Sequence, residues 1–167
     1  MPPLTKLPAN STVFVDTNLL SYLYIRKDEL AQSVARFLAR GSDGEIQIVT
    51  STSVVEDVLH RVMIFEAVTR HDIEPSRAVA YLKKHPTLVR SLTKHLTIPS
   101  QLHNQFNINI LAVTHADLHG SKRFCSEYGL MTNDSVIVAT MQRHKIIHLA
   151  TNDHDFERVQ EIQVWSP

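Results

Sequence analysis

This chain of 167 residues has little of several features that mark other classes of protein. It has a single cysteine, Cys125, so no disulfide can form within the chain, which favours a reducing compartment. No apolar run approaches the roughly 20 residues that a membrane-spanning helix needs. The opening residues, MPPLTKLPAN, lack the apolar segment of a signal peptide. We therefore expect a cytoplasmic protein with no membrane partner.

The chain also lacks an excess of charge of either sign. Its 17 Lys and Arg residues balance 17 Asp and Glu residues, so the formal net charge is zero. No global basic field therefore draws nucleic acid, although a local basic patch would be sufficient to bind it. The apolar fraction of 43% is ordinary for a globular protein, and the length allows a substantial core. We expect one domain spanning residues 1–167.

Short apolar runs alternate with segments of helical periodicity along the chain. Strands are predicted at about 13–15, 46–49, 108–113, 146–149 and 162–165, and helices at about 18–25, 28–40, 53–70, 115–128 and 134–144. Residues 71–106 predict two or three shorter helices, because Pro86 and Pro99 interrupt the periodicity. Alternation of this kind favours an α/β fold, a three-layer α/β/α sandwich with a mainly parallel central sheet.

Polar residues mark the expected ends of three helices. Residues 50–53, Thr-Ser-Thr-Ser, offer several N-caps for the long helix that follows. Thr114 and Asp117 resemble a capping box with Asp in place of Glu, and Gly129 suits the end of that helix. Asn133 is predicted to cap the helix at 134–144.

Acidic residues follow two of the predicted strands, and ligands of such folds bind where the strands end. Asp16 comes directly after the first strand, and Asp153 ends a Thr-Asn-Asp triplet after the fourth. The same triplet ends at Asp134, at a helix start that favours an anion. Glu56 lies near the edge of the apolar stripe of the long helix. Each residue alone is typical of an ordinary turn or helix start, so the hypothesis rests on the four together.

Four carboxylates at one edge of a sheet would repel one another unless protons, basic side chains or cations compensate them. No basic residue stands beside Asp16, Glu56 or Asp134 in the sequence, although a distant one could fold in. Two divalent ions would balance four carboxylates in formal charge. Ligation by oxygen alone favours Mg²⁺ or Mn²⁺ over Zn²⁺. We therefore expect a divalent metal site at this edge of the sheet.

Four segments together resemble a known family. They read VFVDTNLLSYLY, TSTSVVEDVLHRVM, YGLMTNDSVIVATMQRHKI and LATNDHDFERV, and they occur in the order found in the PIN-domain family. The closest likeness is to the VapC-type toxin branch. The resemblance implies a metal-dependent endoribonuclease that leaves 5′ phosphate and 3′ hydroxyl ends. It also implies an RNA substrate, a homodimer, and an inhibitory antitoxin protein as partner.

The resemblance also assigns residues by position. The acidic site of the family falls on Asp16, Glu56, Asp134 and Asp153, which would hold the metal ions and serve catalysis. Three further residues match auxiliary polar positions near the metals, namely Asn18, Thr151 and Asp155. Ser135 stands where the family often has Ala, which is a mild departure.

Residues 70–106 are longer than the corresponding stretch of the smallest toxins of this type, so no family role transfers to them. The part from Arg70 to His95 holds six Lys and Arg residues against only Asp72 and Glu74. This helical basic segment could contact RNA phosphates, or it could be an ordinary solvated face. Tyr81 is its only aromatic residue, so stacking on bases is not supported.

Two other functions are compatible with the sequence. A phosphohydrolase could use Asp16 as nucleophile, but that chemistry usually wants a second Asp two residues on, and position 18 is Asn. The chain could also be a non-catalytic RNA-binding or partner-binding PIN module that keeps the fold without the activity. The complete acidic set argues against this third possibility.

Overall fold

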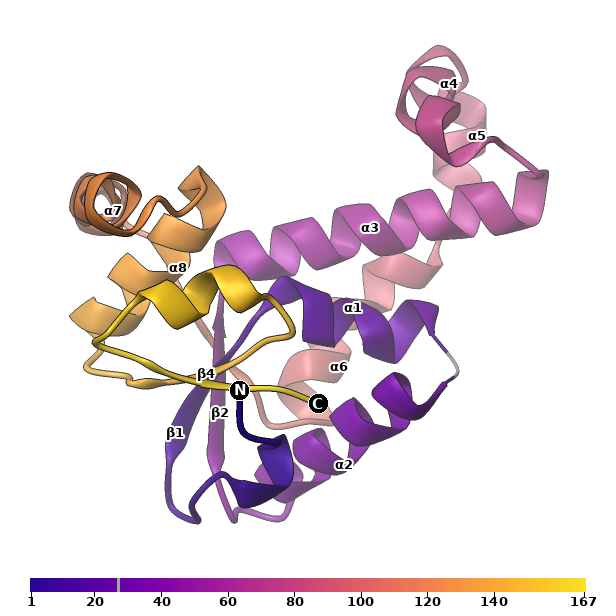
Figure 1. Ribbon diagram of the computed structural model, residues 1–167. Coiled ribbons are helices and arrows are strands. Elements are labelled where there is room, and N and C mark those ends of the chain that lie inside the picture. Colours follow the sequence, from indigo (N-terminus) through magenta and orange to yellow (C-terminus); the bar gives the residue numbers. More distant parts are fainter. Residues whose placement is uncertain (27) are drawn as a thin grey trace.

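The computed structural model describes residues 1–26 and 28–167, and it contains one five-stranded sheet (Figure 1). The strands are β1 (Thr12–Val15), β2 (Gln47–Ser51), β3 (Asn109–Leu111), β4 (His148–Ala150) and β5 (Gln163–Trp165). Their order is β3-β2-β1-β4-β5, and each of the four pairings is parallel. The central strand β1 places Phe14 opposite Val49 of β2 and Leu149 of β4. The predicted parallel sheet is therefore confirmed.

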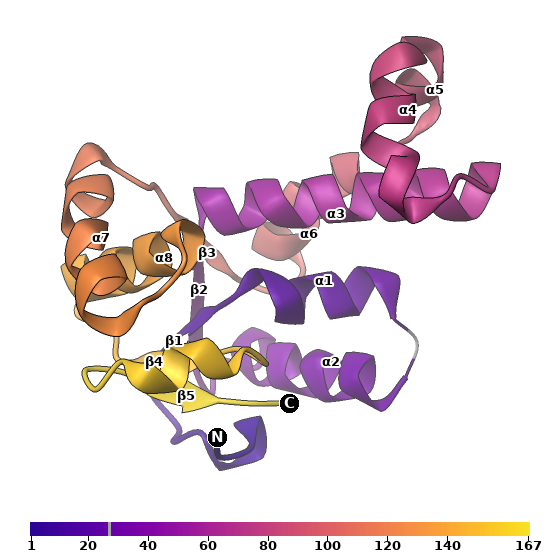
Figure 2. The same ribbon diagram turned by 45° about the horizontal axis from the view of Figure 1, so that its top comes forward.

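Helices cover both faces of this sheet. The α-helices are α1 (Thr17–Ile25), α2 (Glu29–Ser42), α3 (Thr52–His71), α4 (Ala78–Lys84), α5 (Pro86–Ser91), α6 (Ile98–Asn104), α7 (His115–Tyr128) and α8 (Thr132–Arg143). Short 3₁₀ turns are η1 (Leu4–Lys6), η2 (Pro75–Arg77), η3 (Lys94–Thr97) and η4 (His154–Arg158). Helices α1, α2, α3 and α6 lie on one side of the strands, and α7 and α8 lie on the other (Figures 1 and 2). This arrangement is the predicted three-layer α/β/α sandwich. Within the described ranges, no helix combines the length and the apolar character that crossing a bilayer requires.

The strands form the centre of the core because their side chains are apolar on both faces. Val13, Phe14 and Val15 of β1 have no exposed surface. Large buried side chains from both helical layers pack against them, among them Phe37 of α2 and Phe124 of α7. A strand that is buried on both sides must be apolar throughout, which explains the short uninterrupted runs in the sequence.

The helix ends follow the predicted chemistry with one exception. Ser51 caps α3 by accepting a hydrogen bond from the backbone of Val54 at 3.3 Å. Thr114 and Asp117 form the predicted capping box of α7, and Gly129 ends that helix with a φ of 64°. Asn133 does not cap α8, so that prediction was wrong. The first turn of α8 begins one residue earlier and closes on the carbonyl of Met131, so Asn133 already lies inside the helix.

Helix α3 continues well beyond the sheet and carries a separate helical unit at its far end (Figures 1 and 2). We call residues 75–97 the arm. Glu66 of α3 is only 1% exposed and accepts hydrogen bonds from the backbones of Thr93 and Lys94, and from Arg70 at 3.1 Å. Burial alone would raise the pKa of Glu66, but these hydrogen bonds and the charge of Arg70 lower it. The arm is therefore anchored to α3 by a buried, ionised carboxylate.

Candidate active site

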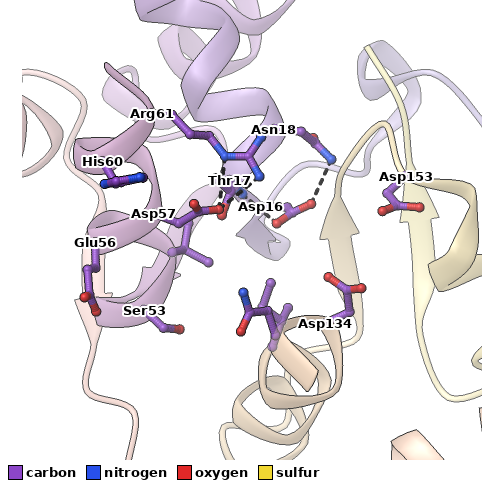
Figure 3. A pocket seen from close by; sticks show the side chains of 13 residues that line it. Asp16, Thr17, Asn18, Ser53, Glu56, Asp57, His60, Arg61, Asp134 and Asp153 are labelled. Atoms are coloured by element: carbon purple, nitrogen blue, oxygen red, sulfur yellow. Dashed lines mark hydrogen bonds and ion pairs between the residues drawn. The ribbon is translucent and has the colours of Figure 1, made fainter. Parts of the chain in front are cut away.

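A cavity of about 550 Å³ opens at the carboxyl end of β1, between α3, α8 and the loop after β4 (Figure 3). It is lined by Asp16, Thr17, Asn18, Ser53, Val54, Glu56, Asp57, His60, Arg61, Asn133, Asp134, Ile137 and Asp153. We call it the acidic pocket. It contains all four predicted acidic residues, and it lies at the strand ends, where the parallel fold predicts a site.

Asp16 forms the floor of the pocket, where β1 passes into α1. Its carboxylate is 6% exposed and acts as the N-cap of α1, accepting a hydrogen bond from the backbone of Thr17 at 2.6 Å. Burial raises the pKa of Asp16 to about 6, against the lowering effect of hydrogen bonds from Thr151 and Thr17. The negative charges of Asp134 and Asp153 add to the increase. Three carboxylates from separate parts of the chain therefore share one electrostatic environment.

Two of the predicted auxiliary residues hold Asp16 in place. The hydroxyl of Thr151 and the amide of Asn18 each donate to Oδ2 of Asp16 at 2.8 Å. The amide of Asn18 also donates to the hydroxyl of Thr151 at 2.8 Å, and its carbonyl oxygen accepts from the backbone of Asn152 at 3.1 Å. The Thr-Asn-Asp triplet after β4 therefore fixes the carboxylate at the end of β1, besides supplying Asp153.

Asp134 and Asp153 face the same space from opposite sides. Asp134 lies in the first turn of α8, and within the described chain no hydrogen bond or ion pair reaches its carboxylate. Burial raises the pKa of Asp134 to about 6, with further increases from the charges of Asp153 and Asp155. Asp153 accepts a hydrogen bond from the backbone of Asp155 at 2.9 Å. The carboxylate of Asp155 pairs with Arg158 at 2.6 Å, so this third auxiliary residue is already compensated.

Glu56 belongs to the pocket but lies apart from the three aspartates. Its side chain is exposed, and Figure 3 shows it directed away from Asp16, Asp134 and Asp153. The neighbouring Asp57 points toward the centre instead, because adjacent residues of a helix differ by about 100° in direction. The structure thus places the predicted fourth carboxylate at the rim of the pocket.

Sequence reasoning missed several residues that line the acidic pocket, namely Ser53, Asp57, His60, Arg61 and Asn133. The most consequential is Arg61, whose guanidinium forms an ion pair with Asp57 at 3.1 Å. A signal for it was present, because residues four apart on a helix share a face. His60 and Arg61 stand four residues after Glu56 and Asp57.

The donor set of the pocket suits a hard divalent ion, since its charged ligands are all carboxylates. Burial is the main cause of the raised pKa values of Asp16 and Asp134, and the charges of neighbouring aspartates add to it; a bound cation would counter both effects. Within residues 1–26 and 28–167, however, no three acidic, His or Cys side chains stand close enough to enclose an ion. The residues therefore fit a divalent ion by chemistry and charge, and binding would have to draw the carboxylates together.

The basic segment of the sequence lies away from this pocket. Its lysines and Arg90 belong to the arm, at the opposite end of α3 (Figure 1). Lys83, Lys84 and Arg90 are exposed, whereas Arg77 pairs with Glu74 at 3.1 Å. The acidic and the basic surfaces of this chain are therefore separated along one helix.

Comparisons with known proteins agree with the geometry. The model of the PIN domain matches residues 13–162. Ribonuclease VapC6 of Methanocaldococcus jannaschii is 25% identical over 157 residues, covering 92% of this chain and 96% of its own length. Ribonuclease VapC2 of the same organism is 28% identical over 153 residues, covering 91% of each chain.

Solved structures share the fold. A toxin–antitoxin complex from Klebsiella pneumoniae superposes with a TM-score of 0.53 at 19% identity, covering 90% of this chain and 95% of the other. VapBC2 from Rickettsia felis, bound to a DNA fragment from its promoter, gives 0.54 at 14% identity, with coverage of 93% and 98%. VapC20 of Mycobacterium tuberculosis, a toxin that cleaves the Sarcin-Ricin loop, gives 0.55 at 17% identity, with coverage of 87% and 92%.

Proposed function

Because this chain belongs to the PIN-domain family, we propose that it is a divalent-metal-dependent endoribonuclease and the toxin of a toxin–antitoxin pair. The curated relatives are both ribonucleases of the VapC type and match the chain over nearly its whole length. The observation that carries the proposal is the convergence of Asp16, Asp134 and Asp153 on one pocket, where burial first and neighbouring negative charges second raise the pKa values of Asp16 and Asp134.

We propose that Asp16, Asp134 and Asp153 hold the metal, with Mg²⁺ or Mn²⁺ as the ion, and that Glu56 joins them when its side chain turns inward from the rim of the pocket. When bound, such ions activate water and stabilise the leaving oxygen of an in-line phosphoryl displacement. The chain's own residues prepare this chemistry. Thr17, Thr151 and Asn18 hold the carboxylate of Asp16 in one orientation, so little rearrangement of that ligand is needed.

A phosphohydrolase that uses Asp16 as nucleophile fits the geometry less well. Asn18 donates to Asp16 where that chemistry would want an acid. A purely binding module would not need the cluster of mutually repelling carboxylates.

The remaining expectations rest on the resemblance to VapC-type toxins. We propose RNA as substrate, a homodimer in solution, and an antitoxin protein that inhibits the enzyme. We also propose a cytoplasmic location, which agrees with the single cysteine. The whole chain is proposed to be one PIN-like domain, with the arm as an extension of α3. Sedimentation and copurification with the product of a neighbouring small gene would test the two protein partners.

The test of the catalytic proposal is a cleavage assay with fluorogenic RNA. Purified protein is incubated with Mn²⁺, with Mg²⁺ and with EDTA, beside the Asp134→Asn variant. We expect cleavage with a divalent ion, none with the chelator, and a loss of orders of magnitude in the variant. Metal-independent cleavage, or full activity of Asp134→Asn, would contradict the proposal.

A further inference from the structure

We propose that Arg61 binds a backbone phosphate of the RNA strand beside the scissile bond, and that Asp57 holds the guanidinium there until RNA arrives. This inference rests on the proposed ribonuclease function. It assigns a substrate-binding role to a residue outside the acidic set.

The position of Arg61 supports the role. Arg61 lies on the face of α3 that lines the acidic pocket, and Figure 3 shows its guanidinium reaching over the pocket toward Thr17 and Asn18. Its Nε and Nη2 atoms both approach Oδ2 of Asp57 at 3.1 Å. The cation therefore stands beside the carboxylates without touching Asp16.

The charge of the pocket requires such a residue. Five carboxylates line it, namely those of Asp16, Glu56, Asp57, Asp134 and Asp153. Among the described lining residues, Arg61 alone carries a permanent positive charge. Metal ions would offset part of the negative charge, but an approaching strand brings its own negative phosphates. A guanidinium is well suited to receive one, since its planar donors match two phosphate oxygens.

The ion pair between Arg61 and Asp57 is weak enough for Arg61 to exchange Asp57 for a phosphate. The side chains of Arg61 and Asp57 are 51% and 34% exposed, so water competes with the pair and its net stabilisation is small. Arg143 offers the contrast, since it donates to both oxygens of the buried Asp117 and to the carbonyl of Ala112. Arg143 is a fixed structural cation, whereas Arg61 can leave its partner.

Arg61 lies at the edge of the acidic pocket, beside a second cavity. With His60 it lines this cavity of about 390 Å³, which continues along α3 between Ile25, Ile64, Phe65, Val68, Pro75 and Val79. The two cavities therefore meet at His60 and Arg61. A phosphate on Arg61 would therefore lie at the rim of the acidic pocket, next to the scissile one, whereas the rest of the second cavity is apolar and provides no further phosphate contact.

The test measures RNA binding without cleavage. A short fluorescein-labelled single-stranded RNA of mixed sequence is titrated by anisotropy in EDTA at several KCl concentrations. Four full-length proteins are compared: wild type, Arg61→Ala, Asp57→Asn and the matched control Arg36→Ala. Arg36 is an exposed arginine on α2 that does not line the acidic pocket. Thermal unfolding confirms that each variant is folded.

The two partners of the ion pair should have opposite effects. Arg61→Ala should weaken binding on the order of tenfold, as expected for loss of hydrogen bonds to a charged group. It should also reduce the slope of log K against log salt by about 0.7, the value for one phosphate contact on a single strand. Asp57→Asn should strengthen binding and keep the slope, because it frees Arg61 and removes a repelling charge. Arg36→Ala should behave as wild type.

The outcomes separate this inference from the ribonuclease proposal. If Arg61 only stabilised α3, both pair variants would act alike and the salt slope would not change, which would overturn the inference. Lack of binding by the wild type at low salt would overturn it as well. Cleavage of the same RNA is measured in parallel with Mn²⁺. If the wild-type protein binds RNA through Arg61 but does not cleave it, the ribonuclease proposal is overturned and the inference about Arg61 stands.

Discussion

The hydroxyl of Thr151 donates a hydrogen bond to Oδ2 of Asp16 at 2.8 Å, and both side chains are buried. These residues are 135 positions apart, yet they stand at the ends of the adjacent parallel strands β4 and β1. The bond links the carboxylate on the floor of the pocket to the loop that carries Asp153. Any ligand of the acidic pocket depends on this link.

Replacing Thr151 tests the link. Thr151→Val keeps the shape but removes the donor, so the carboxylate of Asp16 loses a lowering influence on its pKa. We expect the protein to lose about 1–3 kcal/mol of stability at neutral pH, and the acid limb of its cleavage profile to move to higher pH. Thr151→Ser, which retains the hydroxyl, is the control. An unchanged profile in Thr151→Val would show that the bond does not govern Asp16.

The stability of the metal-free protein should fall as the pH rises. The folded pKa values of Asp16 and Asp134 are both about 6, above the ordinary value of 3.8. Between these values the folded state binds more protons than the unfolded chain, so raising the pH destabilises it. Carboxyl groups with lowered pKa values, such as Glu66 and Asp117, change the stability in the opposite direction below about pH 4.5, so the effect of Asp16 and Asp134 is clearest between about pH 5 and 6. Urea unfolding in EDTA across this range measures the slope, and Asp134→Asn should reduce it.

Divalent ions should reverse this trend. A cation binds the deprotonated carboxylates, so stabilisation by Mg²⁺ or Mn²⁺ should be large above about pH 6 and absent below about pH 5. At a concentration 100 times Kd the gain would be about 2.7 kcal/mol per site. Melting curves with EDTA, Mg²⁺ and Mn²⁺ at both pH values measure how far each ion raises the melting temperature. A transition that no ion shifts would count against the metal site.

The two Thr-Asn-Asp triplets should respond alike to loss of charge. Asp134→Asn and Asp153→Asn should each reduce RNA cleavage by orders of magnitude, while melting temperature in chelator stays the same or rises because repulsion is relieved. The double variant should lose little more activity than either single one, since both act through one site. Strict additivity in kcat/KM would indicate that the two carboxylates work independently.

The anchor of the arm should matter for stability more than for chemistry. Glu66→Ala leaves the backbone donors of Thr93 and Lys94 without their acceptor, so we expect a loss of about 2–3 kcal/mol. The loss should appear as faster hydrogen exchange across residues 75–97, with cleavage by the distant pocket retained. Glu74→Ala, which removes only exposed contacts, the ion pair with Arg77 and the hydrogen bond from Ser76, is the matched control and should change little.

The sequence predicted what depends on short-range pattern. Uninterrupted apolar runs identified buried parallel strands, and the rule that ligands bind at strand ends selected Asp16 and Asp153. The sequence could not show in which direction each side chain of a helix points around the helix axis. Glu56 and Asp57 are adjacent, and only the packing of α3 decides that Asp57 faces the pocket while Glu56 lies at its rim. The spacing of four residues pairs Arg61 with Asp57 on one face of α3, but only the packing of α3 shows that this face lines the pocket.

The sequence also could not predict contacts between segments that are far apart along the chain. Nothing local in residues 151–153 indicates that the hydroxyl of Thr151 serves Asp16, since that bond exists only once β4 has aligned beside β1. The start of α8 shows that residue type alone does not fix where a helix begins. Asn133 is a good cap by residue type, but the cap position is taken by Met131, two residues earlier, although the side chain of Met131 makes no capping hydrogen bond.

The acidic pocket and the basic arm separate negative from positive charge along α3 in a chain of zero net charge. Helix α3 has 20 residues, about 30 Å of length, with carboxylates near its start and Lys83, Lys84 and Arg90 beyond its end. The electric field of a polyanion should orient such a molecule before contact, so that the arm approaches first. The rate at which the chain meets RNA should therefore depend on ionic strength, although its net charge is zero.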